Sequence, residues 1–261
     1  MSDLIVPGDK LPIQDTETIK TTIGPGIYKV PTSHNLIPCS SGLITVETKN
    51  NNQLVYVESN SKRYIPHTND FVVGIVTGVL GESYKVQLQD FSSPVLLGFM
   101  AFPNATKKNR PNLKVGSAVY ARVLQDIPEI ETELECIDPT SGKEGGFGVL
   151  DESGYIFDVE LNFARELLFN QNTIFLELLA SKCQFEIAIG INGKIWIKCG
   201  EGLKQKTTDA METDEDDEKV AAANNIKDLR ATLAAANFLI KCQHITQDKL
   251  KTELNNAFKG I

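Results

Sequence analysis

The sequence lacks the patterns that mark several common classes of protein. Its 261 residues contain no apolar run as long as the roughly 18 to 20 residues that a membrane-spanning helix needs. The first ten residues, MSDLIVPGDK, show no basic segment followed by an apolar core, so we expect no secretory signal. The five cysteines are scattered, odd in number and form no C-x-x-C pair, and only three histidines are present. We therefore expect reduced intracellular thiols rather than a disulfide framework or a structural zinc site.

Motifs of catalysis are also missing. No G-x-S-x-G, phosphate-binding P-loop or H-E-x-x-H pattern occurs, and the histidines fall in different predicted domains. Glu129, Glu131, Glu133 and Glu135 alternate, which would place four carboxylates on one face of a strand. A solvated polar face explains this pattern better than a metal site, which would draw mixed ligands from several elements. We expect no catalytic residues, no metal and no cofactor.

Acidic charge is concentrated in one segment. The formal net charge is −8, and residues 209–218, DAMETDEDDE, hold seven acidic side chains. The rest of the chain is close to neutral, so any contact with RNA must come from local basic patches. A like-charged run repels itself and stays solvated. We predict a disordered acidic insertion around residues 205–219, and a segment that binds a partner protein is the alternative.

The spacing of apolar residues predicts three domains and a fold of the α+β class. Residues 1–64 hold short β-type runs between turns, including a hairpin of 43–48 with 54–58. Residues 65–148 hold five β-type runs with glycines where a strand must curl, which is typical of a small five-stranded Greek-key barrel. Residues 149–261 mix strands and helices. The five barrel strands are expected at 71–79, 84–89, 95–100, 115–123 and 134–137.

The last predicted domain carries most of the helix signals. A strand over 155–160 precedes Asn162, a residue type that caps helices, and an apolar run to Phe169. Further helices are expected at 173–183, at 220–242 because of the many alanines, and at 247–258 after a Thr246 cap.

A Gly-x-x-Gly quartet at residues 190–193 allows two interpretations. In RNA-binding KH domains a loop of this kind clamps the nucleic-acid backbone, and it joins two helices. Here the quartet separates the alternating runs FEIAI and KIWIK, which is the setting of a β-hairpin. Asn192-Gly193 then predicts a two-residue type I′ turn, with Trp196 anchoring the second strand. We favour a structural role for Gly190, Asn192, Gly193 and Trp196 over RNA clamping.

The best candidate for RNA contact is the stretch TKKNRP at residues 106–111. Lys107, Lys108 and Arg110 place three cations within four residues of a predicted barrel loop. Loops of such barrels contact oligonucleotides, and cations neutralise phosphates with little regard to sequence. A solubilising loop, or one that pairs with an acidic neighbour protein, remains the alternative. Four rings could add base stacking, although most are expected in the core: Tyr84, Phe91, Phe99 and Phe102.

Several stretches together resemble a known family, the ribosomal-RNA-processing protein 40 family of S1/KH cap subunits of the eukaryotic exosome. The resemblance spans nearly the whole chain and is closest to fungal members. The acidic run at 209–218 departs from the family pattern. The matching stretches are KRYIP (62–66), NDFVVG (69–74), SYKV (83–86), MAFPNATKKNRP (100–111), GGFG (145–148), LNFAR (161–165) and GINGKIW (190–196).

The resemblance implies a fold, partners and a cellular setting. It implies an N-terminal β domain at 1–64, an S1 barrel of the OB type at 65–148 and a KH-type domain at 149–261. It further implies a non-catalytic subunit that lines the entrance of a channel and guides single-stranded RNA to a separate nuclease. The implied partners are the RNase PH-like ring subunits and the other S1-containing cap subunits, in the nucleus, nucleolus and cytoplasm, with no membrane. A stand-alone S1/KH protein that binds single-stranded RNA, and a nuclease, are the alternatives.

Overall fold

The structure is a computed structural model of the 261-residue chain. It describes residues 3–11, 20–49, 52–60, 62–103, 105–106, 109, 111–127, 130–143, 145–170, 172–200 and 215–259; side chains of 215–225 are excepted. The chain divides into two compact units, Met1–Ser61 and Lys62–Ile261, and each is described by itself. Within the described residues, no helix has both the length and the apolarity needed to cross a membrane.

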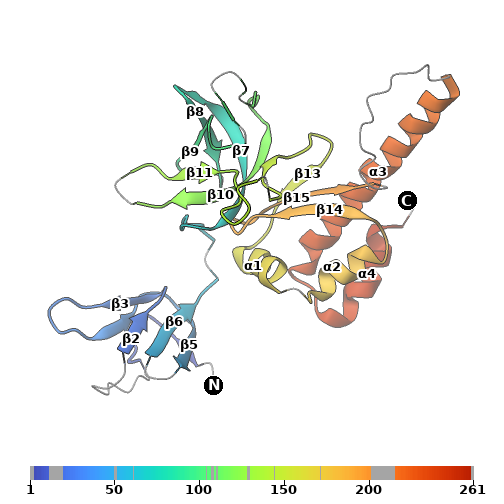
Figure 1. The fold of residues 1–261 in the computed structure, drawn as a ribbon. Coiled ribbons are helices and arrows are strands. Elements are labelled where there is room, and N and C mark those ends of the chain that lie inside the picture. Colours follow the sequence, from blue (N-terminus) through green and yellow to red (C-terminus); the bar gives the residue numbers. More distant parts are fainter. Residues whose placement is uncertain are drawn as a thin grey trace. The chain divides into compact units, whose positions relative to one another are not determined.

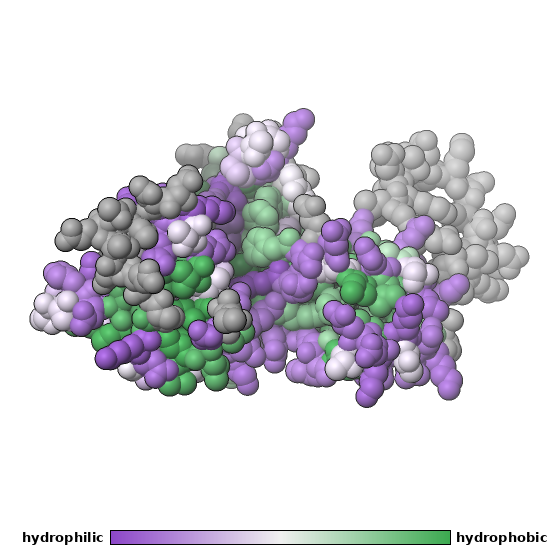
Figure 2. All heavy atoms as spheres, turned by 90° about the horizontal axis from the view of Figure 1, so that it is seen from below, coloured by the Kyte–Doolittle hydropathy of each residue, from purple (hydrophilic) through white to green (hydrophobic). Residues whose placement is uncertain are grey.

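The first unit is a small β domain, as predicted. Its main sheet has the order β1-β5-β6-β2, and a separate pair, β3 and β4, packs near it. The predicted hairpin is confirmed as β5 with β6, which pair from Leu43↔Glu58 to Lys49↔Asn52. Apolar side chains also gather on the outer surface of this unit (Figure 2). The strands are β1 (Leu4–Ile5), β2 (Lys20–Ile23), β3 (Ile27–Lys29), β4 (Leu36–Pro38), β5 (Gly42–Lys49) and β6 (Asn52–Glu58).

The second unit begins with the predicted five-stranded barrel (Figure 1). Its strands follow the order β11-β9-β8-β7-β10, and β11 also pairs with β10, which closes the barrel. A bulge at Thr77 shifts the pairing of β7 with β8 and bends β7. The strands are β7 (Phe71–Leu80), β8 (Ser83–Gln87), β9 (Val95–Gly98), β10 (Ala118–Gln125) and β11 (Glu133–Glu135).

The barrel domain begins earlier and ends later in the sequence than the predicted limits, 65 and 148. Tyr64, assigned from sequence to the N-terminal domain, is buried in the barrel core beside Val72 and Val123. A short strand, β12 (Gly148–Val149), pairs with β10, so Val149 also belongs to the barrel sheet. The local sequence pattern is too short to show the burial of Tyr64 or the strand pairing of Val149.

The rest of the unit is a three-stranded antiparallel sheet, β13-β15-β14, with helices packed on one side of it (Figure 1). Its core joins strand residues such as Ile195 and Ile197 to Phe238 and Leu239 of the longest helix. The elements are β13 (Tyr155–Asp158), α1 (Leu161–Phe169), α2 (Ile174–Ala180), β14 (Phe185–Ile189), β15 (Lys194–Cys199), α3 (Glu215–Cys242), η1 (Gln247–Lys249) and α4 (Leu250–Ala257).

Two helix starts and one capping hydrogen bond differ from the sequence predictions. Asn162 lies inside α1, whose N-cap is Glu160, so the predicted cap is wrong. Thr246 does precede the last helical segment, but its side chain makes no capping hydrogen bond, and the segment starts as a 3₁₀ turn. Residues 215–219, predicted to be disordered, form the start of α3. The alanine-rich run that follows favours helix, and acidic residues favour a helix N-terminus. Residues 205–214 of the predicted insertion lie outside the described residues.

Candidate nucleic-acid interface

The connection between β9 and β10 carries the predicted RNA-contact residues. Lys107, Lys108 and Arg110 themselves lie outside the described residues, so the structure does not place their side chains. The turn around them is defined by its ends. The Thr106 amide donates to the Asn109 carbonyl at 2.9 Å, and the Asn109 amide donates to the Thr106 carbonyl at 3.1 Å. These two bonds bring Thr106 and Asn109 together, and the predicted turn at 106–111 stays a prediction for the three cations themselves.

The residues before and after the basic stretch of this connection are held by the barrel. On the leading side Phe102 is buried in the barrel core, and on the returning side Leu113 is buried there too. The Tyr84 hydroxyl donates to the Pro111 carbonyl at 2.5 Å and lies 3.3 Å from the Leu113 amide nitrogen. The described residues on either side of the basic turn (residues 106–111) are therefore held by the barrel.

Hydrogen bonding places the start of this connection at one end of the barrel. The Phe99 amide, just after β9, donates to the Glu82 carbonyl in the β7–β8 turn at 3.0 Å. The connection therefore starts at the end of the barrel where β7 finishes and β8 begins. Phe71, the first residue of β7, lies at the other end, where its carbonyl accepts from the Ile191 amide at 2.8 Å. The β9–β10 connection thus starts at one end of the barrel, and the 190–193 quartet contacts the opposite end.

The quartet forms a hairpin turn, although not of the predicted type. Ile189 pairs with Ile195, the Gly190 amide donates to the Lys194 carbonyl at 2.9 Å, and the Gly193 amide donates to the Gly190 carbonyl at 3.0 Å. Gly193 has a φ of +83°, whereas Asn192 is not among the described residues with positive φ. A type I′ turn needs positive φ at both central residues, so that prediction is wrong. The loop has three residues, with Gly193 in the left-handed position that closes it.

The side chain of Asn192 is hydrogen-bonded to the barrel. It is 1% exposed, and its amide nitrogen donates to the carbonyls of Val73 at 2.9 Å and Leu88 at 2.6 Å. Its amide oxygen accepts from the Val73 amide at 3.2 Å. Pairing of β7 with β8 ends at Ile75↔Gln87, so these backbone groups lie just beyond the ladder. The Asn192 amide satisfies buried groups that would otherwise have no partner, which is costly.

The glycines of the quartet allow this close approach. A Cβ atom added to Gly190 would lie 2.2 Å from the Asn192 amide oxygen and 2.6 Å from the Val73 nitrogen. One added to Gly193 would lie 2.7 Å from the Val159 carbonyl oxygen. A phosphate backbone cannot reach the quartet while these contacts are in place. They support the structural role predicted for the quartet, which remains a prediction.

Lys194 and Trp196 extend the same contact. Lys194 is 5% exposed, and its ammonium group lies 2.8 Å from an Asp158 carboxylate oxygen and 3.9 Å from one of Asp90. The one cation beside the quartet is therefore already paired. Trp196 packs with Val73 of the barrel, and its indole nitrogen donates to the Asp151 carbonyl at 3.1 Å.

The loop that corresponds to an RNA clamp lies elsewhere. In the order strand, helix, helix, strand, strand, helix, the clamp loop joins the first two helices. Here residues 170–173, Asn-Gln-Asn-Thr, join α1 to α2 and include no glycine. Within this loop the Asn172 amide donates to the Asn170 side chain at 3.1 Å. The sequence analysis did not single out this loop, although its place between two predicted helices would have identified it.

The predicted stacking rings have separate environments. Tyr84 and Phe102 are buried in the barrel core, and Phe99 packs against that core with its ring centroid 4.7 Å from that of Tyr84. Phe91 is fully exposed. The expectation that most of these rings are core residues is therefore correct for three of the four.

The remaining charged groups offer no converging site. Glu135 pairs with the buried Arg122 at 3.0 Å, while Glu129 lies outside the described residues. Within the described ranges, no group of three or more His, Cys, Asp or Glu side chains is placed to hold a metal ion.

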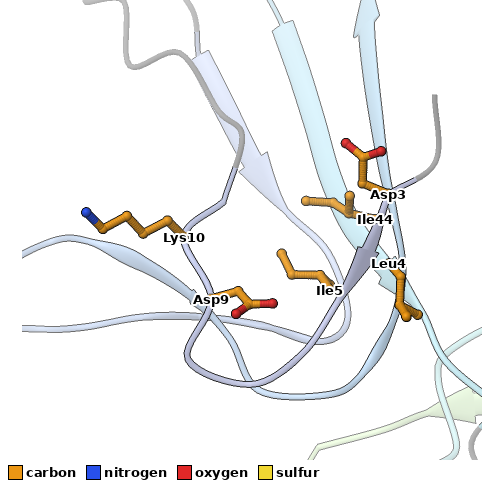
Figure 3. A pocket seen from close by; sticks show the side chains of 6 residues that line it. All are labelled: Asp3, Leu4, Ile5, Asp9, Lys10 and Ile44. Carbon is orange, nitrogen blue, oxygen red and sulfur yellow. The ribbon is translucent and has the colours of Figure 1, made fainter.

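A hollow in the N-terminal unit has Lys10 pointing away from Asp3 (Figure 3). It is lined by Asp3, Leu4, Ile5, Asp9, Lys10 and Ile44.

Comparison with known proteins gives consistent matches along the chain. The family models described as "Exosome complex exonuclease Rrp40 N-terminal domain", "Exosome complex component RRP40, S1 domain" and "KH domain" match residues 21–63, 64–148 and 154–203. Exosome complex component RRP40 of Saccharomyces cerevisiae is 52% identical over 203 residues, which cover 77% of this chain and 83% of that protein. The Schizosaccharomyces pombe protein of the same name is 37% identical over 73% of this chain and 79% of its own length. The human one is 34% identical over 75% of this chain and 60% of its own length.

Proposed function

Because the chain belongs to the RRP40 family of exosome complex components, we propose that it is a non-catalytic, RNA-binding cap subunit of that complex. In this role it stabilises a ring of RNase PH-like subunits beside the other S1-containing cap subunits. It guides single-stranded RNA into the central channel, where a separate 3′-to-5′ exoribonuclease acts. The processes served are rRNA processing, RNA surveillance and mRNA turnover, in the nucleus, nucleolus and cytoplasm.

One observation carries this proposal. The three matching family models follow one another from residue 21 to residue 203. Their order is that of the β domain, the barrel and the KH-type domain along the chain. The glycine-free loop at 170–173 and the buried quartet at 190–193 argue against a stand-alone KH protein that clamps RNA by itself. RNA contact then falls to the basic turn, whose weak binding is added to that of neighbouring subunits.

The basic turn provides the direct test. Replacing Lys107, Lys108 and Arg110 by alanine should reduce RNA crosslinking and RNA decay by the reconstituted complex. The slope of log K against log salt should become shallower by about two, since each of the three lost phosphate contacts on a single strand accounts for about 0.7. A matched control replaces three exposed lysines of the KH-type domain, Lys182, Lys227 and Lys251.

Two results would contradict the proposal. Unchanged crosslinking and decay in the triple variant would leave the chain a scaffold without RNA contact. Loss of labelled RNA on incubation of the purified chain with magnesium, abolished by chelation, would make it a nuclease. We expect no cleavage by the pure chain, and co-purification of the ring and cap subunits with it from cells.

A further inference from the structure

Phe91 stands out because an exposed ring occupies an unfavourable backbone position. It lies in the tight turn Gln89–Ser92 between β8 and β9, where the Ser92 amide donates to the Gln89 carbonyl at 3.2 Å. The Ser92 hydroxyl donates to the same carbonyl at 2.8 Å. Phe91 has a φ of +61° and a relative exposure of 105%. The turn is therefore well defined, and its tip carries a ring that contacts water.

The conformation of Phe91 is one that the sequence would not be expected to choose. It is the third residue of the turn, and Asp90 before it is not among the described residues with positive φ. That combination of φ signs matches a type II turn, in which glycine or asparagine normally occupies the third position. A bulky residue with positive φ is a genuine outlier, and such outliers cluster at sites of function. Burial within its own chain does not offset the cost at Phe91.

The surroundings of the turn are polar and partly cationic. The Gln89 side chain accepts from the Tyr64 amide at 2.9 Å and donates to the Lys62 carbonyl at 3.1 Å. These two hydrogen bonds hold residues 62–64 beside the turn, and Lys62 is exposed. The acidic neighbour Asp90 has the Lys194 ammonium group 3.9 Å away, which offsets part of its charge.

A polar strand face leads from this corner to the end of the barrel where the β9–β10 connection starts. The side chains of Ser83, Lys85 and Gln87 alternate with the buried Tyr84 and Val86, so they point outward along β8. The strand spans about 17 Å at 3.4 Å per residue. Its first residue lies at the end of the barrel that carries the β9–β10 connection, and its last precedes the Phe91 turn. Barrels of this type bind about four or more nucleotides each.

We propose that Phe91 is a stacking platform for one base of single-stranded RNA, at the end of a track that runs along the outward face of β8. The proposal rests on the RNA-guiding role given above and adds a contact to it. Every base has a face that can stack on an aromatic ring, so such a platform accepts any sequence. Lys62 and Lys85 supply cations for the flanking phosphates. The platform lies on the turn after the second barrel strand.

The experiment measures binding of fluorescein-labelled 12-nucleotide oligouridylate and oligoadenylate to the full chain by anisotropy at several salt concentrations. Phe91→Leu keeps an apolar side chain and removes the ring. We expect it to weaken affinity at least about fivefold for both oligonucleotides, with an unchanged salt slope because no phosphate contact is lost. Ultraviolet crosslinking to oligouridylate should label the peptide that contains Phe91. Phe169→Leu, which changes a ring 67% exposed at the end of α1, is the matched control and should change neither result.

A second variant separates binding from folding. Phe91→Gly suits the positive φ, so it should melt no lower than the natural chain and still lose affinity. If both Phe91 variants bind like the natural chain while the Lys107, Lys108 and Arg110 triple variant loses binding, the platform is wrong and the proposed function stands. If neither set changes binding, both are wrong. Normal RNA binding with reduced assembly into the complex would overturn the platform in favour of a protein contact at Phe91.

Discussion

The two ends of the barrel are both formed by tight turns, yet they differ in what surrounds them. At one end the hairpin of β14 and β15 is buried, and Asn192 gives all its amide hydrogen bonds to barrel backbone. At the other end the β7–β8 turn and the β9–β10 connection leave side chains such as Leu80 and Met100 exposed. A glycine turn therefore does not by itself indicate a binding loop. The partners of its backbone decide whether it is a support or an interface.

Removal of the Asn192 amide should have the largest effect on this contrast. Asn192→Ala leaves the Val73 amide and the carbonyls of Val73 and Leu88 without their partner. Since each unsatisfied buried group costs about 1–3 kcal/mol and some will find water, we expect a loss of roughly 3 kcal/mol in the free energy of unfolding. Urea denaturation of the full chain measures it.

A matched asparagine checks that the effect comes from the contact. Asn172 is exposed in the α1–α2 loop, and Asn172→Ala should change the free energy of unfolding by no more than about 0.5 kcal/mol. A loss below about 1 kcal/mol for Asn192→Ala would show that the contact between hairpin and barrel adds little, and that the two ends do not differ in the way described.

Two glycines with positive φ, one at each end, sharpen the comparison further. Gly193→Ala combines a φ of +83° with a Cβ only 2.7 Å from the Val159 carbonyl oxygen, so we expect a loss of about 2 kcal/mol. Gly81→Ala has a φ of +59° but no atom within 4 Å of the new Cβ, and should cost about 1 kcal/mol from strain alone. Thermal and urea unfolding measure both. Equal losses would mean that close packing at the quartet is not what distinguishes it.

The smallest effect concerns Asp151, at the edge of the buried end. A hydrogen bond from the Lys198 ammonium group, together with one from the Ser153 amide, lowers the pKa of Asp151 to about 2. A lowered carboxyl pKa adds stability above the unfolded value of about 3.9, and that stability is lost as pH falls toward 2. The difference in unfolding free energy between the natural chain and Asp151→Asn should therefore be small at pH 7 and shrink between pH 4 and 2.

The neighbouring residue supplies the control for this pH dependence. Glu152 is exposed, and Glu152→Gln is the matched control variant, measured in the same way. An Asp151→Asn difference that stays constant over this range would show that the ion pair with Lys198 does not stabilise the fold, as is common for exposed pairs.

Local patterns in the sequence were sufficient for the barrel and for the hairpin at 185–199. The alternation of Tyr84 and Val86 with polar residues, and of Ile187 and Ile189, reflects a period of two that a half-buried strand imposes. The Gly-x-Asn-Gly setting between two such runs predicted a turn rather than a clamp. The predicted cap Asn162 is wrong because the choice of cap depends on where the preceding strand ends, whereas Thr246 does occupy the N-cap position of η1, without a side-chain capping hydrogen bond.

The sequence by itself determined the fold class, the order of the three domains and the family, because these follow from short-range periodicity and from long matching stretches. Tertiary structure decided which groups meet. The bond from Asn192 to Val73 joins residues 119 positions apart, and no local pattern predicts such a contact. The exposure of Phe91, when three other candidate rings are covered, likewise depends on which side of a strand or turn the folded barrel covers. Burial is a property of the assembled fold, and it separates the residues that support this protein from those that we propose as contacts for RNA.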